Sequence, residues 1–220
     1  MITKNRLWKS VVVLFFVTGM VGSASITSSA KTNEEVEVAQ MVRSTKRAKA
    51  KKVTVKLGSQ SAGGAAMVDP SSGVNGGGAP AFSVCIRTTR RYDTEASEDG
   101  IKSWNRTGAA DLSLVSSESA AKIVIINDDY GKTDWVGETV ITRRGGKIVS
   151  ARVKLNDYFL KNFNDTVRQS VVEHELGHAM GLPHTSNTRS VMYPSLDVKN
   201  PRLISAFDIN SLENLYDNAA

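Results

Sequence analysis

Apolar residues follow two different periods along the chain after residue 80, and the two periods predict strands alternating with helices. Short runs rich in β-branched and apolar residues are typical of strands that are buried in a sheet. Two glycines, at positions 145 and 146, suit a hairpin turn between the last two of these runs. The predicted strands are 82–87, 111–115, 122–127, 139–142 and 147–155.

Three other segments have apolar positions three or four residues apart, which predicts amphipathic helices. The first helix covers 94–107, in spite of Gly100 in its interior. The second begins at Asn164 or Asp165, because either side chain can cap a helix. The third begins at Ser205, which forms a capping box with Asp208. The apolar stripes of these helices consist of Ile101 and Trp104; of Val167, Val171, Val172, Leu176 and Ala179; and of Ile209, Leu212 and Tyr216.

The first thirty residues have the layout of a secretory signal peptide. Lys4, Arg6 and Lys9 precede an apolar run at 11–21, and small residues follow it. A helix needs about 20 apolar residues to cross a bilayer, so an uncleaved membrane anchor is the weaker alternative. The sequence therefore predicts an exported protein, extracellular or associated with the cell surface, that begins after Ala24 or Ala30.

The positive charge of the chain is concentrated in its first quarter. Residues 31–52 contain seven basic and three acidic side chains, whereas residues 53–220 contain 18 basic and 19 acidic ones. Because the latter part is near neutral, the formal net charge of +6 does not indicate a nucleic-acid-binding protein. The basic run at 43–52 is interpreted as a solvated linker, with attachment to an anionic cell surface or a protease-sensitive site as alternatives.

Residues 58–80 are dominated by glycine, serine and alanine, a composition that does not bury enough apolar surface to form a core. We therefore interpret 31–80 as a prosegment or linker. The domain is then 81–220, which is a typical domain size.

All three histidines of the chain lie within the eleven residues HELGHAMGLPH, at 174–184. On a helix, His174 and His178 stand at i and i+4, so both imidazoles leave the same face. Gly181 can adopt a left-handed conformation and Pro183 cannot continue a helix, so the chain turns and brings His184 back. Three imidazoles with an open fourth position predict a catalytic Zn²⁺ site.

Glu175 follows the first histidine, so its side chain points to the side of the histidine pair. In this place it can accept a proton from a metal-bound water without coordinating the metal. The alternative is a cluster of structural histidines in a core. That alternative does not explain why histidine is absent from the rest of the chain.

The eleven-residue motif resembles the signature of the metzincin zinc metalloproteases, and the segment Ser190-Val191-Met192-Tyr193-Pro194 is similar to their Met-turn. Thr185 and the order Met-Tyr-Pro are most similar to the matrixin branch. The resemblance implies that Met192 lies beneath the three ligands, and that Tyr193 and Pro194 shape the wall of the substrate pocket. It also implies an α+β fold over 81–220, with a twisted mixed sheet, an active-site helix, the Met-turn and a C-terminal helix.

The activity implied by this resemblance is that of a secreted zinc endopeptidase acting on a protein or peptide substrate. Zinc would polarise the scissile carbonyl and a bound water, and Glu175 would act as general base and then protonate the leaving amine. An edge strand at 138–142 would pair with the extended substrate backbone.

Two features allow more than one interpretation. Cys85 is either a small buried residue or a latency thiol such as matrixin prosegments carry, and the absence of Pro-Arg-Cys-Gly around it favours the first. Matrixins also carry a histidine- and aspartate-rich loop for structural zinc and calcium, for which no histidine is left here. Asp128, Asp129 and Asp134 are therefore either a Ca²⁺ site or acidic turn residues.

Two other functions remain as alternatives. The first is a zinc hydrolase that acts on cell-wall peptide. The second is a non-catalytic adhesion module in which the metal only stabilises the fold. Glu175 argues against the second, because a structural zinc site closes its fourth position and needs no base.

Overall fold

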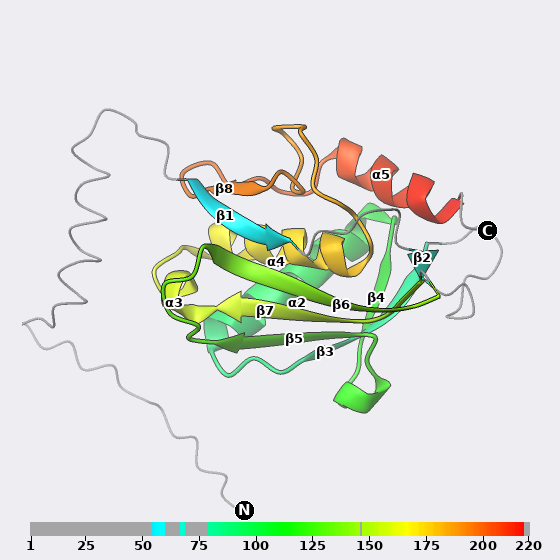
Figure 1. Ribbon diagram of the computed structural model, residues 1–220, viewed down its shortest axis with the longest axis horizontal. Coiled ribbons are helices and arrows are strands. Elements are labelled where there is room, and N and C mark those ends of the chain that lie inside the picture. Colours follow the sequence, from blue (N-terminus) through cyan, green and yellow to red (C-terminus); the bar gives the residue numbers. More distant parts are fainter. Residues whose placement is uncertain (1–53, 60–66, 69–78, 146, 218–220) are drawn as a thin grey trace, which may run out of the picture. The chain divides into compact units, whose positions relative to one another are not determined.

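The computed structural model describes residues 54–59, 67–68, 79–145 and 147–217 (Figure 1). The predicted signal peptide, 1–30, and the basic run at 43–52 lie outside the described residues. Among the described helices, none combines the length and the apolar character needed to cross a bilayer.

Eight strands and four α-helices make up the described part, with one 3₁₀ turn, η2, at Glu118–Ala120. Each strand and helix predicted after residue 80 is present, with ends that differ by a few residues. The strands are β1 (Thr54–Ser59), β2 (Met67–Val68), β3 (Ala81–Ile86), β4 (Asp111–Leu114), β5 (Ile123–Asp128), β6 (Trp135–Arg144), β7 (Lys147–Asn156) and β8 (Ser195–Asp197). The helices are α2 (Arg91–Thr107), α3 (Asp157–Leu160), α4 (Asp165–Ala179) and α5 (Ala206–Asp217).

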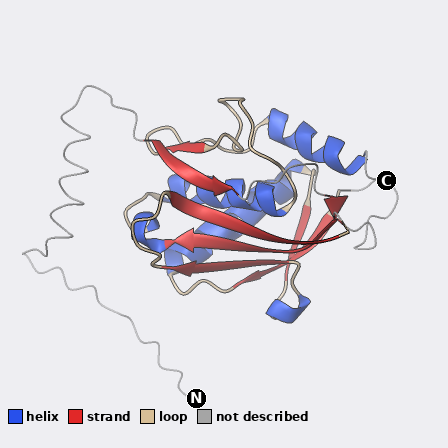
Figure 2. Ribbon diagram, viewed as in Figure 1, coloured by secondary structure: helices blue, strands red, loops and turns tan. Residues whose placement is uncertain are grey.

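All eight strands join one mixed sheet (Figure 2). Its order is β4-β3-β5-β7-β6-β1-β8, and β2 pairs with the start of β7. The neighbours from β4 to β7 are parallel, whereas β6 and β7 form an antiparallel hairpin. Gly145 has φ 58° in this hairpin, the left-handed conformation for which glycine suits such a turn. The predicted α+β class with a mixed sheet is confirmed.

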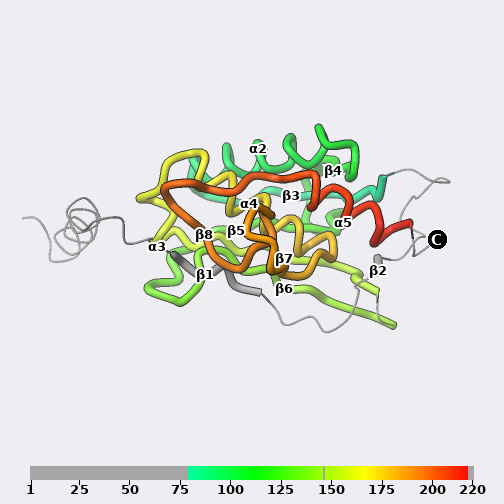
Figure 3. The backbone as a smooth tube through the Cα atoms, turned by 90° about the horizontal axis from the view of Figure 1, so that it is seen from above, coloured from blue at the N-terminus to red at the C-terminus, as the bar shows by residue number. Residues whose placement is uncertain are grey.

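Helices α2 and α4 lie on the same side of the sheet and pack against each other (Figures 1 and 3). Trp104 is fully buried between them, and its Nε1 donates a hydrogen bond to the carbonyl oxygen of Glu173 at 3.0 Å. A Cβ at Gly100 would lie 2.6 Å from Cγ1 of Val172. The glycine in the interior of α2 is therefore the residue that allows the two helices to approach.

The structure corrects the expectation that 138–142 forms an open edge strand. Strand β1 lies beyond β6 and pairs with it in parallel, with Gly58 opposite Glu138 and Ser59 opposite Thr139. On its other side, β1 pairs antiparallel with β8. The expectation was wrong at Glu138 and Thr139 because 54–59 falls within the part interpreted as a prosegment or linker, where no strand is expected. We call the space between β6 and β8, which β1 occupies, the β6–β8 slot.

Cys85 lies in β3 and is buried, with 1% of its surface exposed. Strands β5 and β7 separate β3 from β6, which at about 4.8 Å per strand places them about 14 Å apart. This position supports the interpretation of Cys85 as a small buried residue.

Two of the acidic residues, Asp128 and Asp129 at the end of β5, make hydrogen bonds within the turn that follows. Asp128 Oδ1 accepts the N–H of Asp129 at 2.8 Å, and Asp129 Oδ1 accepts the N–H of Gly131 at 2.9 Å. Asp129 also forms an ion pair with Lys161 at 3.6 Å. These contacts are typical of acidic turn residues and give no support to the calcium interpretation.

Two carboxyl groups meet where α2 begins and β7 ends. Asp93 is fully buried, and the amide of Asn127 donates to Asp93 Oδ2 at 2.9 Å and to Asp157 Oδ2 at 3.2 Å. Arg90 and Tyr92 also donate to Asp157. Burial, followed by the hydrogen bond with Asp157, raises the pKa of Asp93 from 3.8 to about 8. Asp93 is therefore protonated in the folded protein at neutral pH.

We expect Asp93→Asn to flatten the dependence of stability on pH. The unfolded chain loses the Asp93 proton near pH 4 but the folded chain keeps it to about pH 8, so the Asp93 contribution to stability falls as pH rises across that window. An amide in place of the protonated carboxyl can still donate to Asp157. Thermal melts at pH 5 and pH 9 should show that the variant gains stability relative to the parent at the higher pH. An equal difference in melting temperature between variant and parent at pH 5 and pH 9 would contradict the raised pKa of Asp93.

Candidate active site

Helix α4 carries the first two histidines of the motif and is capped at both ends. Asn164 is the N-cap, and its side chain accepts the N–H of Val167 at 3.0 Å. At the other end, the N–H of Gly181 bonds to the carbonyl of His178, and that of Leu182 bonds to the carbonyl of Gly177, both at 2.9 Å. This pair of bonds is a Schellman motif, and Gly181 takes the left-handed φ of 107° that it requires. The predicted stop of the helix at Gly181 is confirmed.

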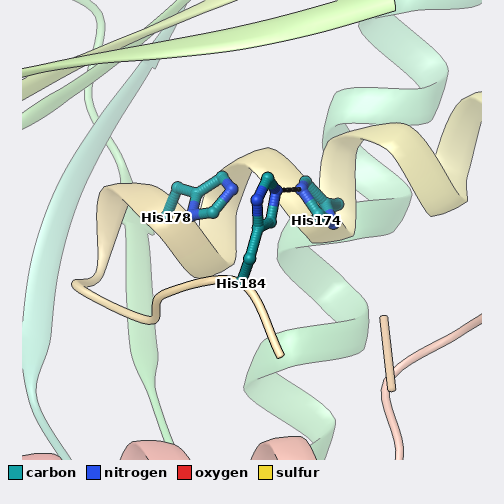
Figure 4. A group of neighbouring side chains, drawn as sticks. All are labelled: His174, His178 and His184. Atoms are coloured by element: carbon teal, nitrogen blue, oxygen red, sulfur yellow. Dashed lines mark hydrogen bonds between the residues drawn. The ribbon is translucent and has the colours of Figure 1, made fainter. Parts of the chain in front are cut away.

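The turn after α4 brings His184 back to His174 and His178, as Figure 4 shows. One ligand nitrogen from each of the three lies within 4.8 Å of the others. The Nε2 atoms of His174 and His184 are 3.2 Å apart. Two nitrogens bound to one tetrahedral zinc ion at about 2.0–2.1 Å would be separated by about 3.3 Å. The three imidazoles therefore fit a zinc ion, and they are the only such group of ligands among the described residues.

Backbone carbonyls fix the tautomer of the two histidines on the helix. Nδ1 of His174 lies 2.6 Å from the carbonyl oxygen of Val191, and Nδ1 of His178 lies 2.8 Å from that of Leu182. A carbonyl oxygen only accepts, so each Nδ1 carries the ring proton. The lone pair on each Nε2 is thus available to a metal. Nε2 of His178 is buried and has no hydrogen-bond partner in the described part of the chain.

Burial also keeps the imidazoles neutral. It lowers the pKa of His178 from 6.5 to about 4, and it lowers the pKa of His174 well below its ordinary value. The pKa of His184, which is half-buried, is lowered for the same reason. Neutral imidazole is the form that binds metal, so the site is prepared for a cation at neutral pH.

The carboxylate of Glu175 is held between α4 and β6. The hydroxyl of Thr139 donates to Glu175 Oε2 at 2.7 Å, whereas Oε1 has no hydrogen-bond partner among the described residues. A Cβ at Gly137 would lie 2.8 Å from Cγ and Oε1 of Glu175, so only glycine leaves room for this side chain. Burial raises the pKa of Glu175 to about 8, against the opposing effect of the Thr139 hydrogen bond. A cation bound at the neighbouring histidines would favour the ionised carboxylate that a general base requires. One oxygen is thus fixed and the other is left for a reactant.

The Met-turn lies against the face of α4 between the two helical histidines. Met192 is buried, and a Cβ at Gly177 would collide with its Sδ. The carbonyl oxygen of Met192 accepts the N–H of Thr185, the residue after His184, at 3.1 Å. Gly177 lies between His174 and His178 in α4, so Met192 packs against the helical turn that carries both histidines.

Asp208 connects the C-terminal helix to the Met-turn. Its Oδ2 accepts the N–H of Ser205 at 2.8 Å, as expected for the capping box, and also the N–H of Val191 at 3.1 Å. Its Oδ1 accepts the hydroxyl of Ser190. Because the carbonyl of Val191 orients His174, a residue of α5 helps to set the position of a metal ligand.

Tyr193 and Pro194 are the last two residues of the Met-turn segment, directly before β8, and both are half-buried. The guanidinium carbon of Arg202 lies 4.6 Å from the centre of the Tyr193 ring. Four further residues shape this site and were not predicted from the sequence: Gly137, Thr139, Gly177 and Arg202. The signals available for two of them were a glycine inside a strand and a glycine inside a helix, which often mark a close approach.

Comparison with known proteins agrees with this geometry. The family model Peptidase_M10, described as Matrixin, matches residues 36–217. Macrophage metalloelastase of Oryctolagus cuniculus is 29% identical over 116 residues, which cover 50% of this chain and 24% of that protein. The same enzyme of Rattus norvegicus is 43% identical over 58 residues, covering 26% and 12%. Matrix metalloproteinase-26 of Homo sapiens is 44% identical over 48 residues, covering 21% and 18%. The chain thus spans at most about a quarter of the length of these relatives.

We expect the three histidines to differ in their effect on zinc content. His174→Ala or His178→Ala should abolish binding, because each removes a buried nitrogen on the rigid helix. His184→Ala should weaken binding severely but leave a two-nitrogen site. Elemental analysis of purified protein measures the stoichiometry. Ser186→Ala, an exposed change in the same loop, serves as the control, and full zinc content in His184→Ala would remove His184 from the ligand set.

Proposed function

The chain belongs to the matrixin family, and we propose that it is a zinc-dependent endopeptidase that hydrolyses peptide bonds in protein or peptide substrates. One observation carries the proposal. Three neutral imidazoles that fit a zinc ion stand on the same helix and turn as a buried carboxylate with one uncommitted oxygen. A purely structural zinc site has all four positions filled by protein ligands, so it does not require a carboxylate with a free oxygen beside the ion.

His174, His178 and His184 would hold the ion through nitrogens that are already unprotonated. Zinc, when bound, supplies a Lewis acid for the scissile carbonyl and the attacking water. Glu175 Oε1 takes the proton of that water and then passes it to the leaving nitrogen. Thr139 holds the other oxygen, so the carboxylate does not need to reorganise during the reaction.

An extended substrate would bind in the β6–β8 slot, where β6 offers backbone groups for pairing and Tyr193 and Pro194 form the wall beside the cut bond. In the structure β1 pairs with both strands of that slot. The part of the chain before residue 80 is therefore proposed as a prosegment, with β1 as the piece that competes with substrate.

The proposed route of this enzyme is export followed by removal of the prosegment. The support is the order of charged, apolar and small residues in 1–30, which is typical of a signal peptide. The basic run at 43–52 offers either a cleavage site or a contact with an anionic cell surface. Because the run precedes β1, removal of β1 would need a further cut after residue 59.

Glu175→Gln should separate an enzyme from a metal-stabilised module. Glutamine has nearly the shape of glutamate but does not accept the water's proton, so peptide cleavage should fall by about 10²–10⁴-fold while zinc binding and thermal stability change little. Cleavage is measured with a diverse peptide library, a casein-like protein and purified cell-wall fragments.

Zinc content of the Glu175→Gln protein is the necessary control, because activity lost together with zinc would show only that the site collapsed. A variant that cleaves as fast as the parent would remove Glu175 from the reaction. If the zinc-loaded parent, freed of its prosegment, cleaved wall fragments alone, the substrate class would be wrong. Cleavage of none of the three would favour the adhesion module.

Removal of β1 should raise the peptidase activity. A chain that starts at residue 53 keeps β1 in the slot, whereas one that starts at residue 61 lacks it. A tethered segment competes with substrate at an effective concentration on the order of millimolar, so we expect the shorter chain to be more than about tenfold more active at low substrate concentration. Equal rates, or a shorter chain that no longer folds in a thermal melt, would make β1 a structural strand.

A further inference from the structure

Asn156, the last residue of β7, is fully buried, and its side chain contacts the turn between β5 and β6. Its Oδ1 accepts the N–H of Tyr130 and the N–H of Tyr158, both at 3.1 Å. Its Nδ2 donates to the carbonyl oxygen of Gly131 at 3.0 Å and to the hydroxyl oxygen of Thr133 at 2.9 Å. Because a backbone N–H only donates and a carbonyl oxygen only accepts, a single orientation of the amide satisfies these contacts.

The turn at 129–134 has little apolar packing of its own. None of its residues is buried, and the ring of Tyr130 packs against that of Trp135, with the ring centres 5.1 Å apart. The ion pair of Asp129 is solvent-exposed, and such pairs contribute little to stability. The hydrogen bonds to the buried side chain of Asn156 are therefore the main contacts that fix the turn to the sheet.

Three oxygens from the turn and from the start of β6 surround Nδ2 of Asn156. They are the carbonyl oxygens of Gly131 and Trp135 and the hydroxyl oxygen of Thr133, at 2.9 to 3.4 Å. Oxygen atoms, backbone carbonyls among them, are the ligands that Ca²⁺ takes in protein loops. An ion and a nitrogen that carries two protons would need the same space between these oxygens. The structural calcium that the matrixin resemblance suggests therefore does not fit at this point.

The turn leads directly into the part of β6 that lies against Glu175. Gly137 is the third residue of β6, and it pairs with Leu155, which precedes Asn156 in β7. A Cβ at Gly137 would lie 2.8 Å from Cγ and Oε1 of Glu175. Because the strand and the carboxylate are in such close contact, a small displacement of the start of β6 changes the position of Glu175.

We propose that the amide of Asn156 takes the place of a structural calcium ion: it fixes the turn at 129–134 and, through the turn, the start of β6 beside Glu175. Asn156 is thus a positioning residue that does not itself touch the substrate. The part of the inference that concerns Glu175 rests on the proposed peptidase function. The part that concerns the turn does not, and it makes the stability of the protein independent of calcium.

The first test measures how Ca²⁺ changes the melting temperature of the full chain. Asn156→Asp keeps the shape of the side chain but replaces two donated protons with a negative charge that faces three oxygens, which is a set of Ca²⁺ ligands. Extracellular modules bind Ca²⁺ at about 10⁻⁴–10⁻³ M. About 10 mM Ca²⁺ should therefore raise the melting temperature of Asn156→Asp by about 2–4 °C and leave that of the parent and of Asn156→Ala unchanged.

Asn162→Asp is the matched control, because it introduces the same charge at an exposed residue in the turn after α3. Its melting temperature should not respond to Ca²⁺. A parent that Ca²⁺ stabilises, or an Asn156→Asp protein that it does not stabilise, would overturn the replacement of the ion by the amide. The melt of the parent decides the question by itself if the Asn156 variants do not fold.

The second test concerns the position of Glu175 and uses peptide cleavage well below the melting temperature. Asn156→Asp and Asn156→Ala should each lose about tenfold, mainly in kcat, because a displaced base affects the reaction more than substrate binding. Added Ca²⁺ should restore kcat in Asn156→Asp alone, and Asn162→Asp should match the parent throughout. Parental kcat in both Asn156 variants would overturn the positioning role. A parent that cleaves no peptide would contradict the peptidase function, whereas the melts would still decide the role of Asn156 in the turn.

Discussion

The site depends on two hydrogen bonds that run from imidazole Nδ1 atoms to backbone carbonyls. The carbonyl oxygens of Val191 and Leu182 accept these hydrogen bonds. The ring proton therefore stays on Nδ1, and the Nε2 of each helical histidine keeps its lone pair. Both carbonyls belong to segments that other contacts hold in place. The Schellman motif fixes Leu182, and Asp208 fixes Val191. The position of the ligands is therefore set by backbone geometry, which side-chain rearrangement does not easily disturb.

The same strand edge serves the fold and the proposed reaction. On one face of β6, Thr139 donates a hydrogen bond to the carboxylate of Glu175 and Gly137 leaves room for that side chain. Along its edge, the backbone of β6 pairs with β1. An unpaired edge strand is prone to associate with other chains, so its coverage by β1 protects the protein as well as filling the slot. Under the proposed function, a substrate that displaces β1 would pair with β6 in its place.

The sequence predicted the three-histidine cluster and the elements after residue 80 because their signals are local. The spacing of His174 and His178, the glycine at 181 and the apolar stripe of α4 need no knowledge of distant residues. Strand β8 has only three residues, and β1 lies between a basic run and a glycine-, serine- and alanine-rich segment, so neither has a comparable local signal. Both are defined by their pairing partners. The hydrogen bonds of Thr139 and Arg202 join residues far apart in sequence, so only the folded arrangement reveals them.

All three metal ligands lie within eleven residues of the chain, and this has a thermodynamic consequence. An ion stabilises a fold only to the extent that it binds the native chain more tightly than the unfolded one. Ligands that are neighbours in sequence stay close after unfolding, so the unfolded chain retains part of its affinity for zinc. This residual affinity would lower the stabilisation that a bound ion gives to the fold. The apolar core around Trp104, Ile125 and Leu155 contributes stability that does not depend on an ion.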